Sequence, residues 1–195
     1  MSTVPKDEAE RLAALQRYGV LDTPPEDSFD RLTRLATRIF DVPIALVSLV
    51  DQDRQWFKSC TGLDVAETPR WTAFCSQAIL SDDVTVVPDA TLDPRFADSP
   101  LVTEMGIRFY AGAPLRSPDG HNLGTLCIKD RVPRDLSAEQ RDMLRDLAAV
   151  VVDEMELRLA LNRLAGSNQE LYRDRARAVR ALHDLEDRTD SPPPA

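Results

Sequence analysis

The chain has 195 residues, of which 43% are hydrophobic and 29% charged, and its formal net charge is −9. This length suits one domain with a packed core plus an accessory element. Because an acidic surface repels phosphate backbones and anionic lipid headgroups, the charge argues against direct binding of nucleic acid or a membrane. The longest apolar run, residues 42–50, is too short to span a bilayer, and the N-terminus lacks the features of a signal peptide. We therefore expect a soluble, cytoplasmic protein.

Two amphipathic helices are predicted before the first strand. Residues 6–18 carry apolar residues at helical spacing among charges, and residues 29–39 repeat this pattern after a break that contains two prolines. After residue 43 the spacing of apolar residues changes from helical to strand-like. Residues 44–50 are β-branched and almost wholly apolar, as in a central strand buried on both faces, and residues 54–60 alternate as a hairpin partner would.

The second half of the domain alternates short elements with one long connection. We predict a short helix at residues 72–80, a strand at 84–87, and a hairpin of strands at 108–115 and 123–129. The connection over residues 88–100 has room for a single helical turn, and loops of this length often cover a site. The predicted fold is α+β, with a mainly antiparallel sheet of five to six strands and helices grouped on one face.

A long C-terminal helix is predicted over residues 136–188, with Ser137 and Gln140 spaced as a capping box at its start. It overlaps the end of a first domain placed at residues 1–160, and residues 189–195 are expected to be a disordered tail. Heptad spacing with one asparagine at an a position is typical of a parallel two-stranded coiled coil, whereas a long solvated helix folded onto its own domain is the simpler alternative. We expect a parallel homodimer. The residues expected in its seam are Leu157, Leu161, Leu164, Asn168, Leu171 and Leu182.

Metal and cofactor signatures are missing from the sequence. His121 and His183 lie far apart in the chain, and no Cys-x-x-Cys or His-x-x-x-His pair occurs. Neither a Walker loop nor a Gly-x-Gly-x-x-Gly run is present, and no core histidine is placed to ligate haem. We predict no metal site and leave any cofactor unknown.

Three widely spaced cysteines offer the best enzymatic alternative. Cys75 falls near the start of a predicted helix, where the backbone dipole lowers a thiol pKa. Cys60 ends one strand and Cys127 lies within another, so the three thiols could meet around one pocket. Free cysteines are more often small buried hydrophobic residues, and we favour that interpretation. An odd count at this spacing does not indicate a disulfide framework.

Aromatic side chains gather around the predicted sheet centre and its covering loop. Such walls line small-molecule pockets, but they also build ordinary cores. Nearby charged residues, among them Arg70 and Arg108, favour a pocket. The candidate ligand-binding residues are Trp56, Trp71, Phe74, Cys75, Asp89, Arg95, Phe96 and Phe109.

Several motifs in one order resemble bacterial GAF domains attached to sensor kinases and cyclic-di-GMP enzymes. They run from Gly19-Val-Leu-Asp-Thr-Pro-Pro-Glu-Asp-Ser-Phe-Asp30 to Leu123-Gly-Thr-Leu-Cys-Ile-Lys-Asp130, and the resemblance covers about residues 6–160. It implies a six-stranded antiparallel sheet with helices on one face and a pocket on the other. Such domains bind small molecules, bilins or cyclic nucleotides, or serve as dimerising scaffolds.

The sequence departs from the specialised members of that family. A bilin-attaching Cys-His pair is missing because Ser76 follows Cys75, and the Asn-Lys-x-Phe signature of cyclic-nucleotide binders is absent. The cysteine spacing does not fit the free methionine sulfoxide reductases. We expect a sensory module that binds a small molecule or a protein partner and relays the signal through a coiled-coil dimer. A cysteine-dependent sulfoxide reductase and a ligand-free dimerisation adaptor are the alternatives.

No kinase, cyclase or DNA-binding segment follows the helix in this sequence. We therefore expect the output to reach a signalling protein in trans, or to pass through a region outside this chain.

Overall fold

The computed structural model describes residues 5–189, apart from the side chains of residues 174, 178, 179 and 181–189. The chain forms one compact unit up to Glu156 and a second unit from Leu157 onward. The elements in chain order are α1 (Glu8–Arg17), α2 (Asp27–Phe40), β1 (Ile44–Val50), β2 (Arg54–Thr61), β3 (Glu67–Pro69), the 3-10 helix η1 (Arg70–Thr72), α3 (Phe74–Ala78), β4 (Thr85–Val87), α4 (Pro100–Thr103), β5 (Phe109–Arg116), β6 (Asn122–Asp130) and α5 (Ala138–Thr189).

The strands form one six-stranded antiparallel sheet in the order β3-β2-β1-β6-β5-β4. This confirms the predicted α+β fold class. β1 is central and wholly buried, as its unbroken apolar run predicts. β3 was not predicted, because a three-residue edge strand that ends in proline carries no alternating pattern.

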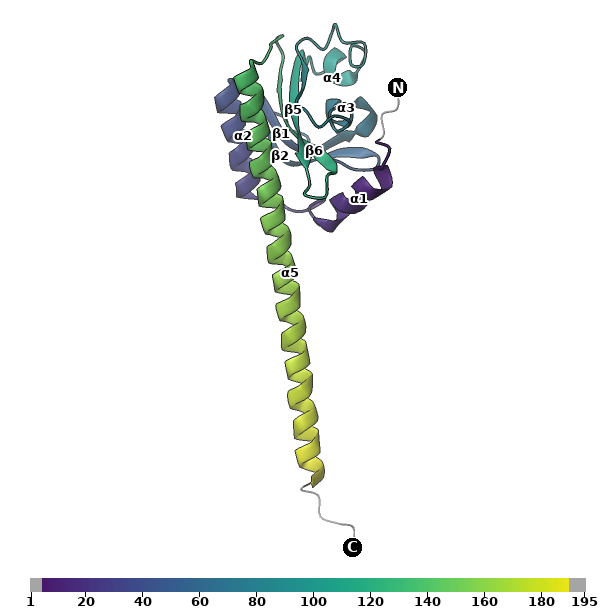
Figure 1. Ribbon diagram of the computed structural model, residues 1–195, viewed down its shortest axis with the longest axis vertical. Helices are drawn as coiled ribbons and strands as arrows, with labels where there is room; N and C mark the ends of the chain where they lie inside the picture. Colours follow the sequence, from purple (N-terminus) through teal and green to yellow (C-terminus); the bar gives the residue numbers. More distant parts are fainter. Residues whose placement is uncertain (1–4, 190–195) are drawn as a thin grey trace. The chain divides into compact units, whose positions relative to one another are not determined.

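The two faces of the sheet are covered differently, as Figure 1 shows for α2 and the N-terminal part of α5 on one side and α3 and α4 on the other. α2 contacts β1, β2 and β6, whereas α3 contacts β5, β6 and β1. Because side chains alternate along a strand, Ile44 and Leu46 face α3, and the intervening residues of β1 face α2. The α3 face holds the cluster in which Phe74, Cys75 and Cys127 are packed.

The start of α5 has the predicted capping box. The Gln140 backbone N–H donates to Ser137 Oγ at 3.2 Å, and the Ser137 N–H donates to Gln140 Oε1 at 3.0 Å. Within the first unit, α5 buries residues at helical spacing, and Tyr18 Oη donates to the Glu156 carboxylate. Both the hydroxyl's burial and that carboxylate raise the pKa of Tyr18, so the phenol stays protonated and the bond persists at neutral pH.

The second unit is the continuation of α5. Leu157, Leu161, Leu164 and Leu171 are each more than half exposed, and the Leu182 side chain lies outside those described. Of the tail predicted at residues 189–195, Thr189 is the last residue of α5, and residues 190–195 lie outside the described residues. Among the described residues, no helix has both the length and the apolar character needed to cross a bilayer.

Candidate functional site

A pocket of about 320 Å³ opens beside α3 in the first unit. Its wall combines two aromatic side chains with small polar ones, a composition suited to a small organic ligand. Four segments contribute: the β1–β2 turn, η1, α3 and the loop before α4. The lining residues are Gln52, Asp53, Arg70, Trp71, Thr72, Ala73, Ser76, Gln77, Arg95, Phe96 and Ser99.

Arg70 holds the rim of this pocket together. Its Nη1 donates to Glu8 Oε1 at 2.6 Å and to the carbonyl oxygens of Asp51 and Gln52 at 3.0 and 3.1 Å. Burial by itself raises the pKa of Glu8, but hydrogen bonds from Arg11 and Arg70 outweigh it and lower that pKa to about 2. Glu8 is therefore ionised at neutral pH and fixes Arg70 between α1 and the β1–β2 turn.

Arg95 also forms an ion pair with a neighbouring carboxylate. It donates to both carboxylate oxygens of Asp93, at 2.9 and 2.6 Å, and its guanidinium lies 5.0 Å from the Phe96 ring centroid. The positive charge that Arg70 and Arg95 bring to the pocket is thus largely neutralised by neighbouring carboxylates. The pocket fits an uncharged or weakly polar ligand with an apolar face better than a strongly anionic one.

A buried aromatic stack separates this pocket from the sheet. The Phe74 ring lies 4.4 Å from Phe96 and 4.9 Å from Tyr110, centroid to centroid. The Tyr110 side chain has room only because residue 112 is a glycine. An added Cβ at Gly112 would lie 2.1 Å from the Tyr110 hydroxyl. Beneath the stack, the Sγ atoms of Cys75 and Cys127 are 3.7 Å apart.

The structure divides the predicted site residues into four groups. Trp71, Arg95 and Phe96 line the pocket, whereas Phe74 and Cys75 belong to the buried cluster between α3 and the sheet. Asp89 instead forms a local turn, accepting hydrogen bonds from the Thr91 N–H and hydroxyl that lower the pKa of its carboxyl.

Trp56 and Phe109 do not belong with this group, which corrects the predicted clustering. Trp56 pairs with Leu49 and Phe109 with Asp130, positions whose side chains point to the α2 face. The residues next to them in the chain, Phe57 and Tyr110, join the cluster under α3 instead. A one-residue step along a strand changes the face, and the apolar runs of buried strands do not reveal which face is which.

Sequence reasoning missed the small polar residues of the pocket wall. Thr72, Ser76, Gln77 and Ser99 line it, yet none belongs to a motif with recognisable chemistry. The only available signal was their position beside Trp71 and Phe96. The Ser99 hydroxyl donates to the Thr72 carbonyl at 3.0 Å and joins the covering loop to η1.

The motif at residues 19–30 contacts strand β2 through polar side chains. The buried Lys58 ammonium donates to Thr23 Oγ1 at 2.9 Å, the Pro24 carbonyl at 2.8 Å and Glu26 Oε1 at 2.5 Å. Arg54, on the same strand, pairs with Asp22 at 2.7 Å. The segment between α1 and α2 is therefore bound to β2 by hydrogen bonds and ion pairs. These contacts account for the acidic residues that precede α2.

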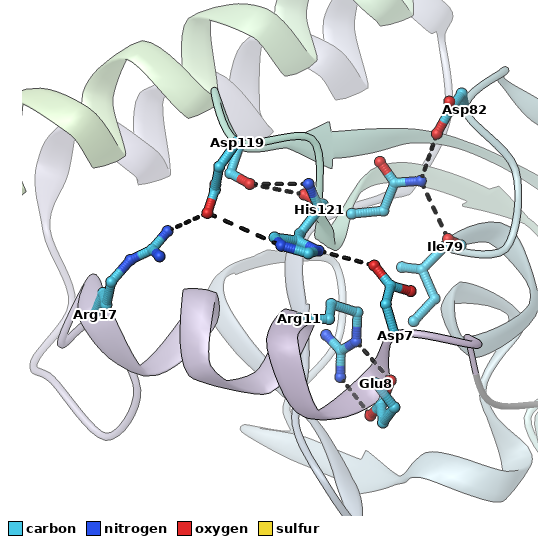
Figure 2. A network of polar contacts seen from close by, with 10 residues as sticks. Asp7, Glu8, Arg11, Arg17, Ile79, Asp82, Asp119 and His121 are labelled. Carbon is cyan, nitrogen blue, oxygen red and sulfur yellow. Dashed lines mark hydrogen bonds and ion pairs between the residues drawn. The ribbon is translucent and has the colours of Figure 1, made fainter.

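A second polar network joins α1 to the β5–β6 turn, and Figure 2 shows it. His121 Nδ1 lies 2.9 Å from Asp7 Oδ2, and Arg17 donates to Asp119 Oδ2 at 2.5 Å. Asp7, Glu10 and His121 bring three possible metal-binding atoms within 4.8 Å of one another. Asp7 and Glu10 are exposed and Asp7 already pairs with His121, so the contacts account for the cluster as a structural link.

The six-stranded sheet, its two differently covered faces and the pocket beside α3 define an α+β domain. Comparison identifies the family. Residues 24–154 match the GAF domain model. The chain is also 48% identical over 151 residues to a cyclic di-GMP phosphodiesterase of Pseudomonas aeruginosa, an alignment that covers 76% of this chain and 26% of the relative. The chain belongs to the GAF domain family, and it spans about a quarter of the length of that relative.

Solved structures agree on the fold. The GAF domain of an Acinetobacter phosphoenolpyruvate-protein phosphotransferase is 16% identical with a TM-score of 0.56, covering 81% of this chain and 98% of its own. Free methionine-R-sulfoxide reductase from Neisseria meningitidis, solved with its substrate, is 20% identical with a TM-score of 0.56, covering 80% of this chain and 92% of its own. At these identities the likeness concerns the fold alone.

Proposed function

We propose that the chain is a cytoplasmic sensory module that binds a small molecule in the pocket beside α3 and relays its occupancy through α5. The pocket carries this proposal, because it joins an apolar wall to convergent polar groups and is bounded by separate segments that a ligand would draw together. A ligand shifts a signalling equilibrium only through its different affinities for two arrangements. The loop around Phe96 and Ser99 is the part of the wall best placed to differ between them.

The proposed output is a parallel homodimer formed by the second unit. Four leucines at heptad spacing are more than half exposed on a helix of 52 residues. A helix of this length gains most of its stability by burying an apolar stripe, and a second copy supplies the matching stripe. Asn168 at an a position would set a parallel register.

The relative suggests what such a module controls. It is named a cyclic di-GMP phosphodiesterase, and this chain corresponds to about a quarter of it. We propose a regulatory rather than a catalytic role for the chain, acting on an enzyme of that kind in the same polypeptide or in trans. Three unpaired cysteines suit the proposed cytoplasmic location.

Gently purified protein is expected to carry a bound small molecule that the Trp71→Ala variant loses. Trp71 lines the pocket and is 80% exposed, so its removal takes away ligand contact and little folding energy. Native mass spectrometry compared with the denatured mass measures the bound mass, and we expect at least about tenfold weaker retention in the variant. Leu92→Ala is the matched control, since Leu92 is equally exposed but lies outside this pocket. If neither the wild-type protein nor the Trp71→Ala variant carried any bound mass, the ligand-free adaptor would be favoured.

Leu161→Glu is expected to convert the dimer to a monomer at micromolar concentration. The substitution places like charges opposite each other in the proposed seam, where leucine would be buried. Light scattering coupled to size exclusion measures the mass. Arg163→Glu is the control, because it also changes charge on α5 but lies at an outward heptad position. If the wild-type protein were a monomer, or if both variants remained dimers, the proposed dimer interface along α5 would be wrong.

A further inference from the structure

A buried pair of thiols lies between α3 and the sheet. Cys75 belongs to α3 and Cys127 to β6, both are fully buried, and their Sγ atoms are 3.7 Å apart. A disulfide needs about 2.05 Å between sulfurs. The two sulfurs would have to approach each other by about 1.7 Å for the bond to form.

The pairing is selective because the third cysteine is held away from Cys127. Cys60 and Cys127 both pair with Leu46, one from each neighbouring strand. Two strand spacings separate them, about 9.6 Å, whereas a disulfide requires Cα atoms within about 7 Å. Cys60 also donates its own hydrogen bond to the Leu63 carbonyl at 3.2 Å.

The surroundings of the pair favour one thiolate. Lys129 lies two residues from Cys127 on the same face, is 2% exposed, and has no carboxylate partner among the ion pairs of residues 5–189. Its ammonium lies 5.8 Å from the Phe74 ring centroid. The Tyr110 hydroxyl donates to Cys75 Sγ at 3.5 Å. A buried cation and a hydroxyl donor both stabilise negative charge on sulfur.

The two thiols therefore differ in character. Burial alone raises both pKa values, but Cys127, Lys129 and Tyr110 outweigh it at Cys75 and lower the pKa of that thiol to about 5. Burial and the neighbouring Cys75 raise the pKa of Cys127 well above its usual value. A thiolate beside a protonated thiol is the arrangement of an attacking and a resolving cysteine.

The pocket lies next to the buried thiol pair and is the side from which a small oxidant would approach. Ala73 and Ser76, which flank Phe74 and Cys75 in the chain, line its wall, and the Phe96 ring forms both part of that wall and part of the stack over Cys75. Local opening of α3 and the covering loop would expose Cys75 without unfolding the sheet.

We propose that Cys75 and Cys127 form a reversible disulfide when the protein meets a hydroperoxide, so that this module carries a thiol oxidation site. The Cys75 thiolate attacks the peroxide oxygen, the O–O bond breaks, and the leaving hydroxide takes a proton to become water. The resulting Cys75 sulfenic acid is attacked by Cys127, which loses its proton as the S–S bond forms and a second water leaves. Overall, two thiols and one hydrogen peroxide give one disulfide and two waters, and a dithiol reductant reverses the step.

The bond would tie α3 to β6 and change the wall of the pocket. That consequence rests on the proposed ligand-binding function, whereas the oxidation chemistry does not. A protein that forms the disulfide but carries no ligand would retain the thiol site and lose the sensory proposal.

The test is peptide mapping of the full chain after treatment with an equivalent of hydrogen peroxide and alkylation of the remaining thiols. Trypsin places the three cysteines on separate peptides, at residues 59–70, 71–95 and 117–129. We expect a linked pair of the 71–95 and 117–129 peptides, with Cys60 alkylated and the link lost after dithiothreitol. Cys60→Ser should form the same link at the same rate, and Cys127→Ser should stop at the sulfenic or sulfinic acid of Cys75.

Three results would overturn the proposal. These are disulfides that involve Cys60, disulfides found only between two copies of the chain, or over-oxidation of Cys75 in the wild-type protein without any disulfide. Linkage driven by free methionine sulfoxide but not by peroxide would also overturn it, in favour of a sulfoxide reductase. Lys129→Met should raise the pH midpoint of Cys75 alkylation by about one unit, and Lys129→Arg should restore it. An unchanged midpoint would refute the positioning role of Lys129.

Discussion

Gly124→Ala is expected to lower the free energy of unfolding by about 3 kcal/mol, at the upper end of the cost of overpacking a core. An added Cβ would lie 1.9 Å from the Ser48 carbonyl oxygen and 2.8 Å from the Leu49 Cα. Both atoms are backbone of the central strand, so neither can rotate away, and the β1–β6 pairing must separate. Urea unfolding followed by tryptophan fluorescence measures the change, because Trp56 is buried in the first unit.

Two other glycines provide matched controls. Gly112→Ala meets the Tyr110 hydroxyl, the end of a side chain that can shift, so its cost should be smaller. Gly166→Ala has no atom within 4 Å of the added Cβ, and it should leave the first unit unchanged while stabilising the helix by up to about 1 kcal/mol. Equal effects at Gly124 and Gly112 would contradict the proposed backbone clash.

Lys58→Met should destabilise the fold by about 3 kcal/mol, the lower end of the cost of breaking a buried ion pair. The Lys58 side chain has no exposed surface. Its ammonium donates hydrogen bonds to the Thr23 hydroxyl and the Pro24 carbonyl and forms an ion pair with Glu26. Methionine fills similar volume but leaves the Pro24 carbonyl without this donor and Glu26 without its charge partner. Thermal and urea unfolding at neutral pH should both report the loss.

Arg54→Gln is the control for Lys58. Arg54 fastens the same segment through Asp22, but its side chain is 28% exposed and water screens its ion pairs. We expect a loss of at most about 1 kcal/mol, and it should shrink in high salt whereas the Lys58 effect persists. If the two substitutions cost the same, burial does not set the strength of this attachment.

The regular elements could be predicted well because each depends on local spacing. The 3.6-residue period placed α1 and α2 within a few residues of their observed bounds, and the apolar run over residues 44–50 coincides with β1. Ser137 and Gln140 located the start of α5, since capping needs only residues three apart. The predicted short helix divides into η1 and α3, because the backbone at Ala73 is extended.

The pocket was only partly predictable because it joins distant segments. Trp71, Arg95 and Phe96 were named from aromatic and charged composition, yet the same reasoning selected Trp56 and Phe109, which face the other side of the sheet. Where strands are buried on both faces, composition cannot assign a side chain to either one. The role of Lys58 was equally hidden, since its partners precede it by more than thirty residues.

The sequence by itself determined the elements, the GAF family and the heptad pattern of α5, because these follow from periodicity and from ordered motifs along the chain. Only the tertiary structure decided which residues share the space under α3. Cys75 and Cys127 are 52 residues apart in the chain, and they meet because β6 pairs beside β1 while α3 packs across both. Contacts of this kind depend on strand order and on the face each side chain takes, which strand pairing sets and local sequence does not.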